Sequence, residues 1–253
     1  MFEPNVGRIL AKLNPSDLVL DVGGWACPFN RAQWILDAQP FETRGFYRTF
    51  GGAPYQGPAE EWFTAATWIQ RDICDHTPWP FANKQFDFAI CSHTLEDVRD
   101  PLWVCSELIR TAKRGYIEVP SRAAESCLGV ERPGQAGLSH HRWLIDITCD
   151  KLQFLQKFHM INADWRFALP SRFRRFLTSE TSVQWLWWEN EFEFEEVSIH
   201  GLAAQEAELI RFAQMTFPRP GWLFALDRVW RQIASLPRRA GGWLRRKACE
   251  FVV

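Results

Sequence analysis

The sequence predicts an α/β protein, with a Rossmann-like, doubly wound and mostly parallel sheet, an antiparallel C-terminal hairpin and a helical C-terminal extension. Two observations predict the sheet. Short apolar runs alternate with turns and helical stretches along residues 17–122, which implies βαβ crossovers with helices on both faces. Acidic residues also follow three consecutive runs, at the rim where doubly wound sheets bind nucleotides.

The elements can be placed in order along this first part of the chain. Residues 4–13 carry apolar side chains at helical spacing and precede a buried strand at 18–20. Further elements are expected as strands at 33–38, 67–72, 86–91 and 115–119 and as a helix at 101–112. The stretch 42–66 is rich in glycine, proline and aromatic residues without a period, and it predicts an ordered loop or lid.

The second part of the chain is less regular. A helix is predicted at 147–158, and the alternating segment around Glu189–Asn190 predicts an antiparallel hairpin. In that hairpin the WLWW run at 185–188 would place alternate rings on the two faces. We therefore expect a domain at 1–200, with a substrate loop at about 120–146, and a helical, basic, Trp-rich extension at 201–253.

Bulk properties limit the setting in which the protein works. Its 253 residues are 47% hydrophobic, enough for one sizeable core, and a net charge of −1 gives no overall attraction to nucleic acid. Seven cysteines form no CxxC pair and favour a reducing compartment. Neither an export signal nor a run of eighteen apolar residues is visible, so we expect a cytoplasmic protein without a nucleic-acid partner.

The rim of the predicted sheet carries the chemistry. Asp21 ends the first strand, and Gly23 and Gly24 follow where backbone must approach a ligand without a Cβ in the way. Asp37 ends the second strand, where a carboxylate accepts hydrogen bonds from a ribose diol, and Asp72 ends the third. Each has a simpler interpretation, as a helix cap for Asp21 and as turn residues for Asp37 and Asp72.

Residues 17–122 resemble the class I S-adenosylmethionine-dependent methyltransferases, of the methyltransferase type 11-like kind. The most specific part is DICDHTPWPFANKQFDFAICSHTLEDVRDPLWVCSELIRTAKRGYIEVPSR. The resemblance implies S-adenosylmethionine as cofactor, with these roles: Gly23 and Gly24 at its methionine part, Asp37 at the ribose, Asp72 and Ile73 at the adenine, and Ser92 and His93 beside it. The sequence departs from the family at Trp25 and Cys27, where further glycines are usual, and at Asp97, where a histidine is common.

Methyl transfer requires mainly that the acceptor and the methyl group are aligned, so neither a metal nor a covalent nucleophile is needed. A hydroxyl acceptor also needs a general base, and the candidates are Glu118, Glu125, His140 and His141. Arg122 and Arg142 are candidates for binding an anionic group of a small-molecule or glycan acceptor. Structural alternatives are a backbone hydrogen bond for His93 and packing of Arg142 on Trp143.

Three rival functions stay open. An N-methyltransferase would need little help from a base, whereas a nicotinamide-dependent oxidoreductase is disfavoured because no G-x-G-x-x-G follows the first strand. The non-enzymatic rival is a catalytically silent, methyltransferase-like scaffold, either binding a partner or lying on a membrane. The C-terminal segment, with Trp222, Leu226 and Trp230 near helical spacing among arginines, suits docking on the core, homodimerisation, peripheral membrane contact or RNA binding.

Overall fold

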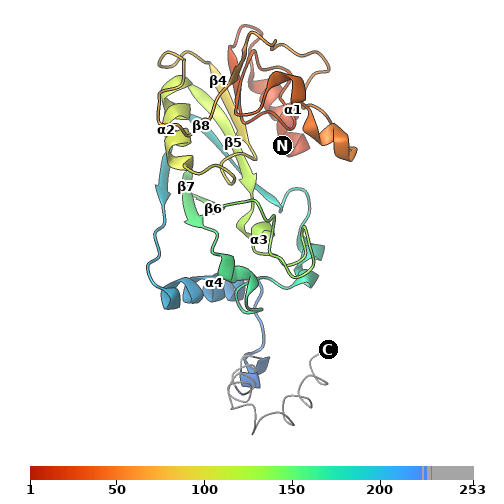
Figure 1. Ribbon diagram of the computed structural model, residues 1–253, viewed down its shortest axis with the longest axis vertical. Coiled ribbons are helices and arrows are strands. Elements are labelled where there is room, and N and C mark those ends of the chain that lie inside the picture. Colours follow the sequence, from red (N-terminus) through yellow and green to blue (C-terminus); the bar gives the residue numbers. More distant parts are fainter. Residues whose placement is uncertain (224, 227–228, 230–253) are drawn as a thin grey trace.

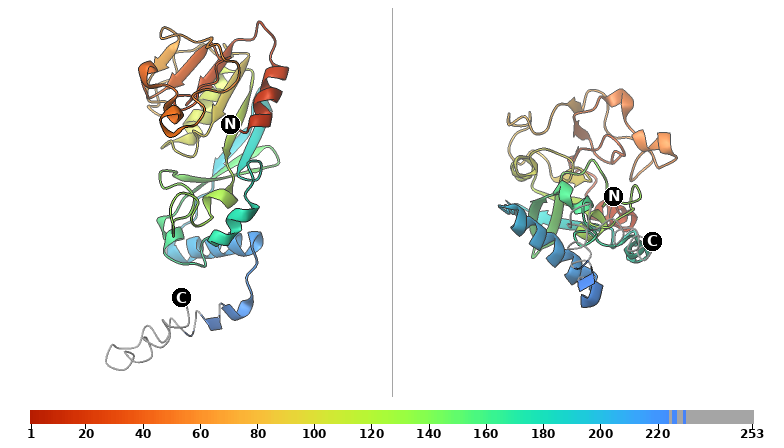
Figure 2. Two further views of the ribbon diagram at one scale, coloured as in Figure 1. Left: turned by 90° about the vertical axis from the view of Figure 1, so that its right-hand side faces the viewer. Right: turned by 60° about the horizontal axis from the view of Figure 1, so that its bottom comes forward.

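A computed structural model describes residues 1–223, 225–226 and 229, and it is elongated, with the main sheet at one end and α4 toward the other (Figures 1 and 2). The main sheet has the order β3-β2-β1-β4-β5-β8. Its strands are β1 (Val19–Val22), β2 (Trp34–Asp37), β3 (Trp68–Gln70), β4 (Phe88–Ser92), β5 (Arg114–Pro120) and β8 (Val183–Glu189). All pair in parallel except β8, which runs antiparallel to β5. The predicted Rossmann-like, mostly parallel sheet is thereby confirmed, with its order reversing between β1 and β4.

Both faces of this sheet are buried, because successive side chains of each strand enter different apolar clusters. Helix α1 (Glu3–Lys12) contributes Ile9 to one cluster, and α2 (Pro101–Thr111) contributes Val104 and Leu108 to the other. The WLWW run follows the same alternation. Its members divide between the faces as predicted, with Trp185 and Trp187 on the α1 side and Leu186 and Trp188 on the α2 side.

The connections between strands differ from the predicted βαβ pattern. Among the connections between parallel strands, only β4–β5 contains an α-helix, α2, whereas the β1–β2, β2–β3 and β3–β4 connections do not. The predicted lid contains two short 3₁₀ helices, Phe41–Thr43 and Phe46–Phe50. Gly23, Gly24 and Pro28 sit within the β1–β2 connection and oppose helix formation there. Long loops therefore form much of the rim that a ligand would meet.

A second, three-stranded sheet has the order β6-β7-β9, with β6 (Trp143–Thr148), β7 (Lys151–Gln156) and β9 (Glu193–Glu196). The helix predicted at 147–158 is wrong, because β6 and β7 form an antiparallel hairpin. Its two-residue turn is Cys149–Asp150, with φ of 50° and 60°, as a type I′ turn requires. Leu152 and Phe154 show the alternation of a strand and are fully buried.

The hairpin predicted around Glu189–Asn190 is also wrong, although its first strand is antiparallel in the main sheet. Strand β9 instead pairs in parallel with β7, so the chain leaves one sheet and enters the other at Asn190. Here φ is 64°, and the amide donates to Lys113 O at 2.7 Å. The reason lies in composition, because β8 is apolar on both faces and suits the larger sheet, whereas β9 alternates with glutamates and suits an edge.

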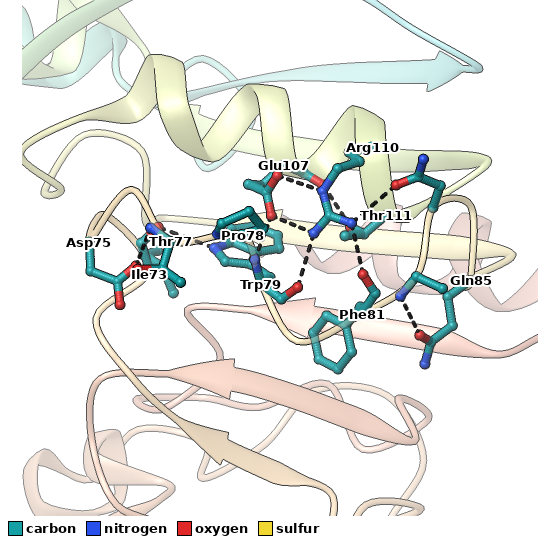
Figure 3. A network of polar contacts seen from close by, with 12 residues as sticks. Ile73, Asp75, Thr77, Pro78, Trp79, Phe81, Gln85, Glu107, Arg110 and Thr111 are labelled. Atoms are coloured by element: carbon teal, nitrogen blue, oxygen red, sulfur yellow. Dashed lines mark hydrogen bonds and ion pairs between the residues drawn. The ribbon is translucent and has the colours of Figure 1, made fainter.

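A buried ion pair fastens the β3–β4 loop to α2 (Figure 3). Glu107 and Arg110 are 2.6 Å apart, and Glu107 accepts the Trp79 amide at 2.6 Å. Arg110 donates to Trp79 O at 3.0 Å and Phe81 O at 2.7 Å. The indole of Trp79, only 2% exposed, donates in turn to Ile73 O at 3.2 Å. The loop that follows β3 is therefore part of the core.

The chain beyond the sheets forms a smaller helical region, with α3 (Arg122–Glu125) and α4 (Leu202–Thr216) (Figure 1). Buried Leu209 and Ala213 attach α4 to neighbouring apolar clusters, and the helical pattern predicted from Leu202 is present. Most of the basic, Trp-rich tail, including Trp230 and the arginines after it, lies outside the described residues. Within the described part, no helix combines the length and apolarity needed to cross a bilayer.

Candidate functional site

A small cavity of about 50 Å³ lies at the carboxyl ends of β1 and β4, where the strand order reverses. Five of the eight residues predicted to bind the cofactor line it, namely Asp21, Gly23, Gly24, Ser92 and His93. The remaining lining comes from Met1, Ala26, Cys27, Tyr47 and Gln56. Doubly wound sheets bind ligands in this crevice, so the structure brings the predicted residues together at the expected place.

The glycine pair is required by space as well as by backbone conformation. Gly23 has a φ of +77°, and a Cβ there would lie 2.1 Å from Thr94 Oγ1. A Cβ on Gly24 would lie 2.3 Å from Asp21 Oδ2. Side chains are therefore excluded at both positions, and backbone is exposed toward the cavity as predicted for this turn.

Asp21 is 4% exposed and accepts the Phe29 amide at 2.9 Å, while none of the described side chains forms an ion pair with it. Burial raises its pKa to about 7, against the opposing effect of the Phe29 hydrogen bond and with a smaller contribution from nearby Asp37. The predicted alternative, a cap on a following helix, does not apply because no helix follows β1. The N-terminal ammonium of Met1, a residue that also lines the cavity, lowers the pKa of Asp21 by the smallest of these effects, and no described side-chain cation pairs with the carboxylate, so a positively charged ligand would stabilise it.

The other two rim carboxylates are engaged within the protein. Asp37 Oδ2 accepts the Trp25 amide at 3.0 Å, and Oδ1 accepts the Gln39 amide at 2.7 Å. Asp37 therefore has the role of a turn residue, the alternative to ribose binding given above. Asp72 is half exposed, pairs with Arg99 and accepts the Cys74 amide. None of these groups lines the cavity, and neither does Ile73, which lies in the core beside α2.

Ser92 and His93 close the far side of the cavity. Ser92 Oγ is buried and has no hydrogen-bond partner among the described residues. His93, at a φ of 52°, lies with Nε2 3.1 Å from Glu118 Oε1 and Nδ1 3.3 Å from Glu96 Oε1. Burial by itself would lower the pKa of His93, but the neighbouring carboxylates of Glu118 and Glu96 outweigh it and raise the pKa to about 9. His93 is thus a cation at neutral pH and not the backbone-bonded residue of the alternative interpretation.

Glu118, a predicted general base, is fully buried and already used. It accepts the Phe2 amide at 2.8 Å and the Tyr116 hydroxyl, in addition to its contact with His93. Burial favours a higher pKa for Glu118, but His93 and the other donors hold the pKa below its usual value. The carboxylate therefore anchors His93 and the start of α1.

Glu125, His140 and His141, the other predicted bases, meet Asp97 in a second cluster. His141, whose side chain is 4% exposed, places Nδ1 2.9 Å from Glu125 Oε1. Glu125 Oε2 accepts from Lys157 Nζ at 2.7 Å. Burial alone would lower the pKa of His141, but the contact with Glu125 dominates and raises it. His140 is exposed.

The two clusters are contiguous, because adjacent Glu96 and Asp97 belong one to each. Glu96 O accepts the amides of Arg142 at 2.7 Å and Trp143 at 3.2 Å, which fastens the predicted substrate loop to the end of β4. Glu96 and Asp97 also act on the phenol of Tyr47, whose pKa is raised first by burial and then by surrounding negative charge. Tyr47 lines the small cavity, so the loops bring both clusters to one rim.

The two arginines predicted to bind an anionic group of the acceptor differ in burial. Arg122 is buried, pairs with Asp146 at 2.7 Å and Glu208 at 2.8 Å, and lies over the ring of Phe212. Its charge is balanced inside the protein, and it joins α3 to β6 and α4. The Arg142 side chain is exposed.

A larger groove, of about 940 Å³, lies elsewhere, between the β3–β4 loop, the start of α2 and the small sheet. Its walls include His76, Arg99, Trp103, Trp143 and Phe194. None of the predicted cofactor residues lines it. The smaller cavity, with its glycines and unpaired polar groups, is therefore the better cofactor candidate despite its size.

Several side chains at this rim were not predicted from the sequence. Tyr47 and Gln56 belong to the predicted lid, but nothing in its aperiodic pattern singles them out. Asp97 stands where the family often has histidine, and this difference is the only feature of the sequence that draws attention to it. No feature of the sequence points to Lys157, since its contact with Glu125 depends on the β6–β7 hairpin that brings the two residues together.

Comparisons with known proteins are limited to structure. No protein-family model matches the chain, and no curated protein matches it in sequence. Solved S-adenosylmethionine-dependent methyltransferases match its fold. One from Mesorhizobium loti is 15% identical, with 61% of this chain and 64% of that chain covered and a TM-score of 0.35. One from Methanosarcina mazei is 17% identical, with 46% of this chain and 57% of that chain covered and a TM-score of 0.32. One from Aquifex aeolicus is also 17% identical, with 47% of this chain and 65% of that chain covered and a TM-score of 0.30. The match spans less than two thirds of each of these solved chains.

Proposed function

We propose that this protein is an S-adenosylmethionine-dependent methyltransferase whose cofactor binds at the carboxyl ends of β1 and β4. The observation that carries the proposal is the convergence of Asp21, Gly23, Gly24, Ser92 and His93 on one cavity at the point where the strand order reverses. When bound, the cofactor supplies a methyl group on a positively charged sulfonium for in-line displacement. The protein's task is to align the acceptor with it.

The residues present fit the methionine end of such a cofactor. The buried Asp21 carboxylate pairs with no described side-chain cation and suits an ammonium group, while buried Ser92 Oγ has no partner among the described residues and suits a hydrogen bond. Gly23 and Gly24 leave room for backbone contact. The adenine end is different, because Asp72 is paired with Arg99 and Ile73 is in the core. Its binding surface must come from other parts of the rim.

Binding requires the 42–66 loop to open, because about 50 Å³ is far below the several hundred Å³ of ligand pockets. Trp25 holds this loop through its stack on Phe46, 4.7 Å between centroids, and through an indole bond to Thr43 O at 2.9 Å. The Phe46–Phe50 turn lies between two left-handed glycines, Gly45 and Gly51. These glycines suit the ends of a segment that moves as a lid.

The acceptor we propose is a small molecule or sugar-like compound methylated on oxygen. His140 and His141 follow β5 on the loop that covers the rim, and Glu125 orients His141. Glu118 is excluded from the role of base by its burial and its existing partners. An amine acceptor would make the histidines dispensable, which a rate measurement on His140→Ala with each acceptor class distinguishes.

A second candidate, a methyltransferase-like scaffold without turnover, is favoured by one observation. Both oxygens of Asp37, the predicted ribose ligand, are occupied by amides of its own turn. If Asp37 never releases them, the site lacks its ribose contact.

Calorimetric titration with S-adenosylmethionine and with S-adenosylhomocysteine tests the proposal. We expect binding by the wild type, strong weakening by Asp21→Asn and a smaller loss in Ser92→Ala. The matched control is Asp17→Asn, which changes a buried aspartate paired with Arg114 before the opposite end of β1. Absence of binding by folded wild-type protein would refute the cofactor site and leave the scaffold, as would equal weakening by Asp17→Asn.

A further inference from the structure

We infer that Asp97, His140 and His141 form a binding site for a divalent transition-metal ion such as zinc. One ligand atom from each lies within 4.8 Å of the other two. His141 Nε2 is 3.7 Å and His140 Nε2 is 3.9 Å from Asp97 Oδ1. The sequence motifs pointed to no metal, and the cofactor proposed above does not need one. An ion held by Nε2 of both histidines would leave neither Nε2 free to accept a proton, so the metal-bound state and the base role proposed above are alternatives at these two residues.

The distances suit a shared ion better than direct contact. A gap of 3.7–3.9 Å is too long for a hydrogen bond. Neighbouring ligands of a tetrahedral zinc ion, each about 2.1 Å from the metal, lie about 3.4 Å apart. The gaps to Asp97 would close by a few tenths of an ångström, and the gap between the two histidines, at most 4.8 Å, by up to about 1.4 Å, for each atom to gain a metal bond.

The cluster contains a buried polar atom that needs a partner. Asp97 Oδ1 is buried and accepts no hydrogen bond among the described residues, and the buried oxygens of adjacent Glu96 accept none either, although Oε1 is within ion-pair distance of His93 Nδ1 at 3.3 Å. Buried oxygens without a hydrogen-bond donor or a cation beside them lower the stability of the folded protein. A cation at the cluster would satisfy Asp97 directly and offset the charge of Glu96.

The surroundings of His141 are those of a metal-binding histidine. Glu125 Oε1 lies 2.9 Å from Nδ1, and Lys157 holds the other Glu125 oxygen at 2.7 Å. Glu125 Oε1 and His141 Nδ1 are within ion-pair distance but are not aligned for a hydrogen bond, so Glu125 favours a proton on Nδ1 and leaves Nε2 for the metal. Nε2 is the atom that faces Asp97.

Backbone contacts hold the two ligand-bearing segments together. Glu96 O accepts the amides of Arg142 and Trp143, and the Trp143 indole donates to Val98 O at 2.9 Å. Asp97 is thus bracketed by bonds to the residues that directly follow His141. The three ligands do not depend on a chance meeting of mobile loops.

Ligand chemistry narrows the ion. Two imidazoles and one carboxylate suit zinc and its first-row neighbours, whereas magnesium and calcium prefer oxygen ligands. His140 is exposed while His141 is buried, so the site is reached from solvent and has room for an exchangeable ligand. When bound, such an ion supplies a Lewis acid that polarises an oxygen of a bound molecule.

The test uses untagged, full-length protein carrying Cys149→Ser and Cys249→Ser, so that these thiols cannot recruit zinc. Calorimetry with zinc alone measures affinity, and visible absorption after cobalt(II) addition reports the ligands. We expect one equivalent of zinc to bind and the Asp97→Asn and His140→Ala variants to lose more than about tenfold in affinity, the loss typical of changing an outer partner of a ligand. His200→Ala, which changes another exposed histidine, is the matched control and should bind as the wild type.

Folding is checked by the unfolding midpoint of each metal-free variant, which should not change for exposed His140. The inference is overturned if the wild type takes up no zinc, or if His200→Ala weakens binding as much as His140→Ala. Because the readouts use no S-adenosylmethionine, they succeed or fail independently of the cofactor proposal.

Discussion

Asp21→Asn should stabilise the protein at alkaline pH while removing cofactor binding. The pKa of Asp21 is raised to about 7, mainly by burial. Because this folded value exceeds the unfolded value near 3.9, ionisation costs stability as the pH rises from about 4 to 7, and the cost is constant above that window. A difference of about three pH units corresponds to about 4 kcal/mol at most. Asparagine cannot ionise and can still accept the Phe29 amide.

The pH dependence gives the sharpest number. For the values above, the penalty in the wild type is about 1.5 kcal/mol at pH 5 and about 4 kcal/mol at pH 8. The advantage of Asp21→Asn in unfolding free energy should therefore grow by about 2.5 kcal/mol between these pH values, whatever constant offset the amide introduces. In a chain of this size that corresponds to a gain of several degrees in unfolding midpoint.

Denaturant unfolding at pH 5 and pH 8 measures the effect on both proteins. Asp17→Asn is the control and should destabilise the protein at pH 8, because it breaks the 2.7 Å pair with Arg114. An advantage of Asp21→Asn that is equal at the two pH values would refute the view that Asp21 is a buried, unpaired carboxylate.

Two further predictions concern the same rim. Gly23→Ala should lower the free energy of unfolding by about 3 kcal/mol, since it combines a positive φ with a Cβ 2.1 Å from Thr94. Gly134→Ala, at a φ of +76° in open space, should lower it by about 1 kcal/mol. Equal losses of stability in urea unfolding would contradict the steric argument. His93 has its pKa raised to about 9 by Glu118 and Glu96 against the effect of burial, so its stabilisation is complete below about pH 6.5 and is lost as the pH rises through about 9. The unfolding midpoint of His93→Gln should consequently vary less than that of the wild type between these pH values, and an unchanged pH profile would argue against the ion pair.

The strands of the main sheet were predictable because their apolar runs are short, separated and buried on both faces. Leu20 and Val22, for example, enter one cluster while Val19 enters the other. The β6–β7 hairpin was not predictable by the same reasoning. Cys149–Asp150 is an unusual pair for a type I′ turn, where Asn-Gly is preferred, and without that signal the apolar residues nearby also fit a helical spacing.

The site was predictable only in part, because strand ends fix backbone position but not what each side chain binds. Asp21, Gly23 and Ser92 lie on or next to β1 and β4, and they converge where expected. Asp37 and Asp72 lie at strand ends too, yet their partners are a turn amide and Arg99 from distant parts of the loops. Hydrogen bonds of this kind depend on loop conformation, for which the sequence offered no period.

The arrangement of charge explains how one rim can serve both proposals. Glu118 and Glu96 are buried and lie on either side of His93, whose side chain is 34% exposed, so one cation lies between two carboxylates. Adjacent Asp97 then faces the two histidines of the substrate loop, which leaves the rim with more carboxylates than cations. A sulfonium-bearing, ammonium-bearing cofactor near Asp21 and a metal ion at Asp97 would each offset part of this excess. Both ligands carry positive charge, so each reduces the electrostatic gain of the other, but the excess of carboxylates is large enough that occupancy of one site does not require vacancy of the other.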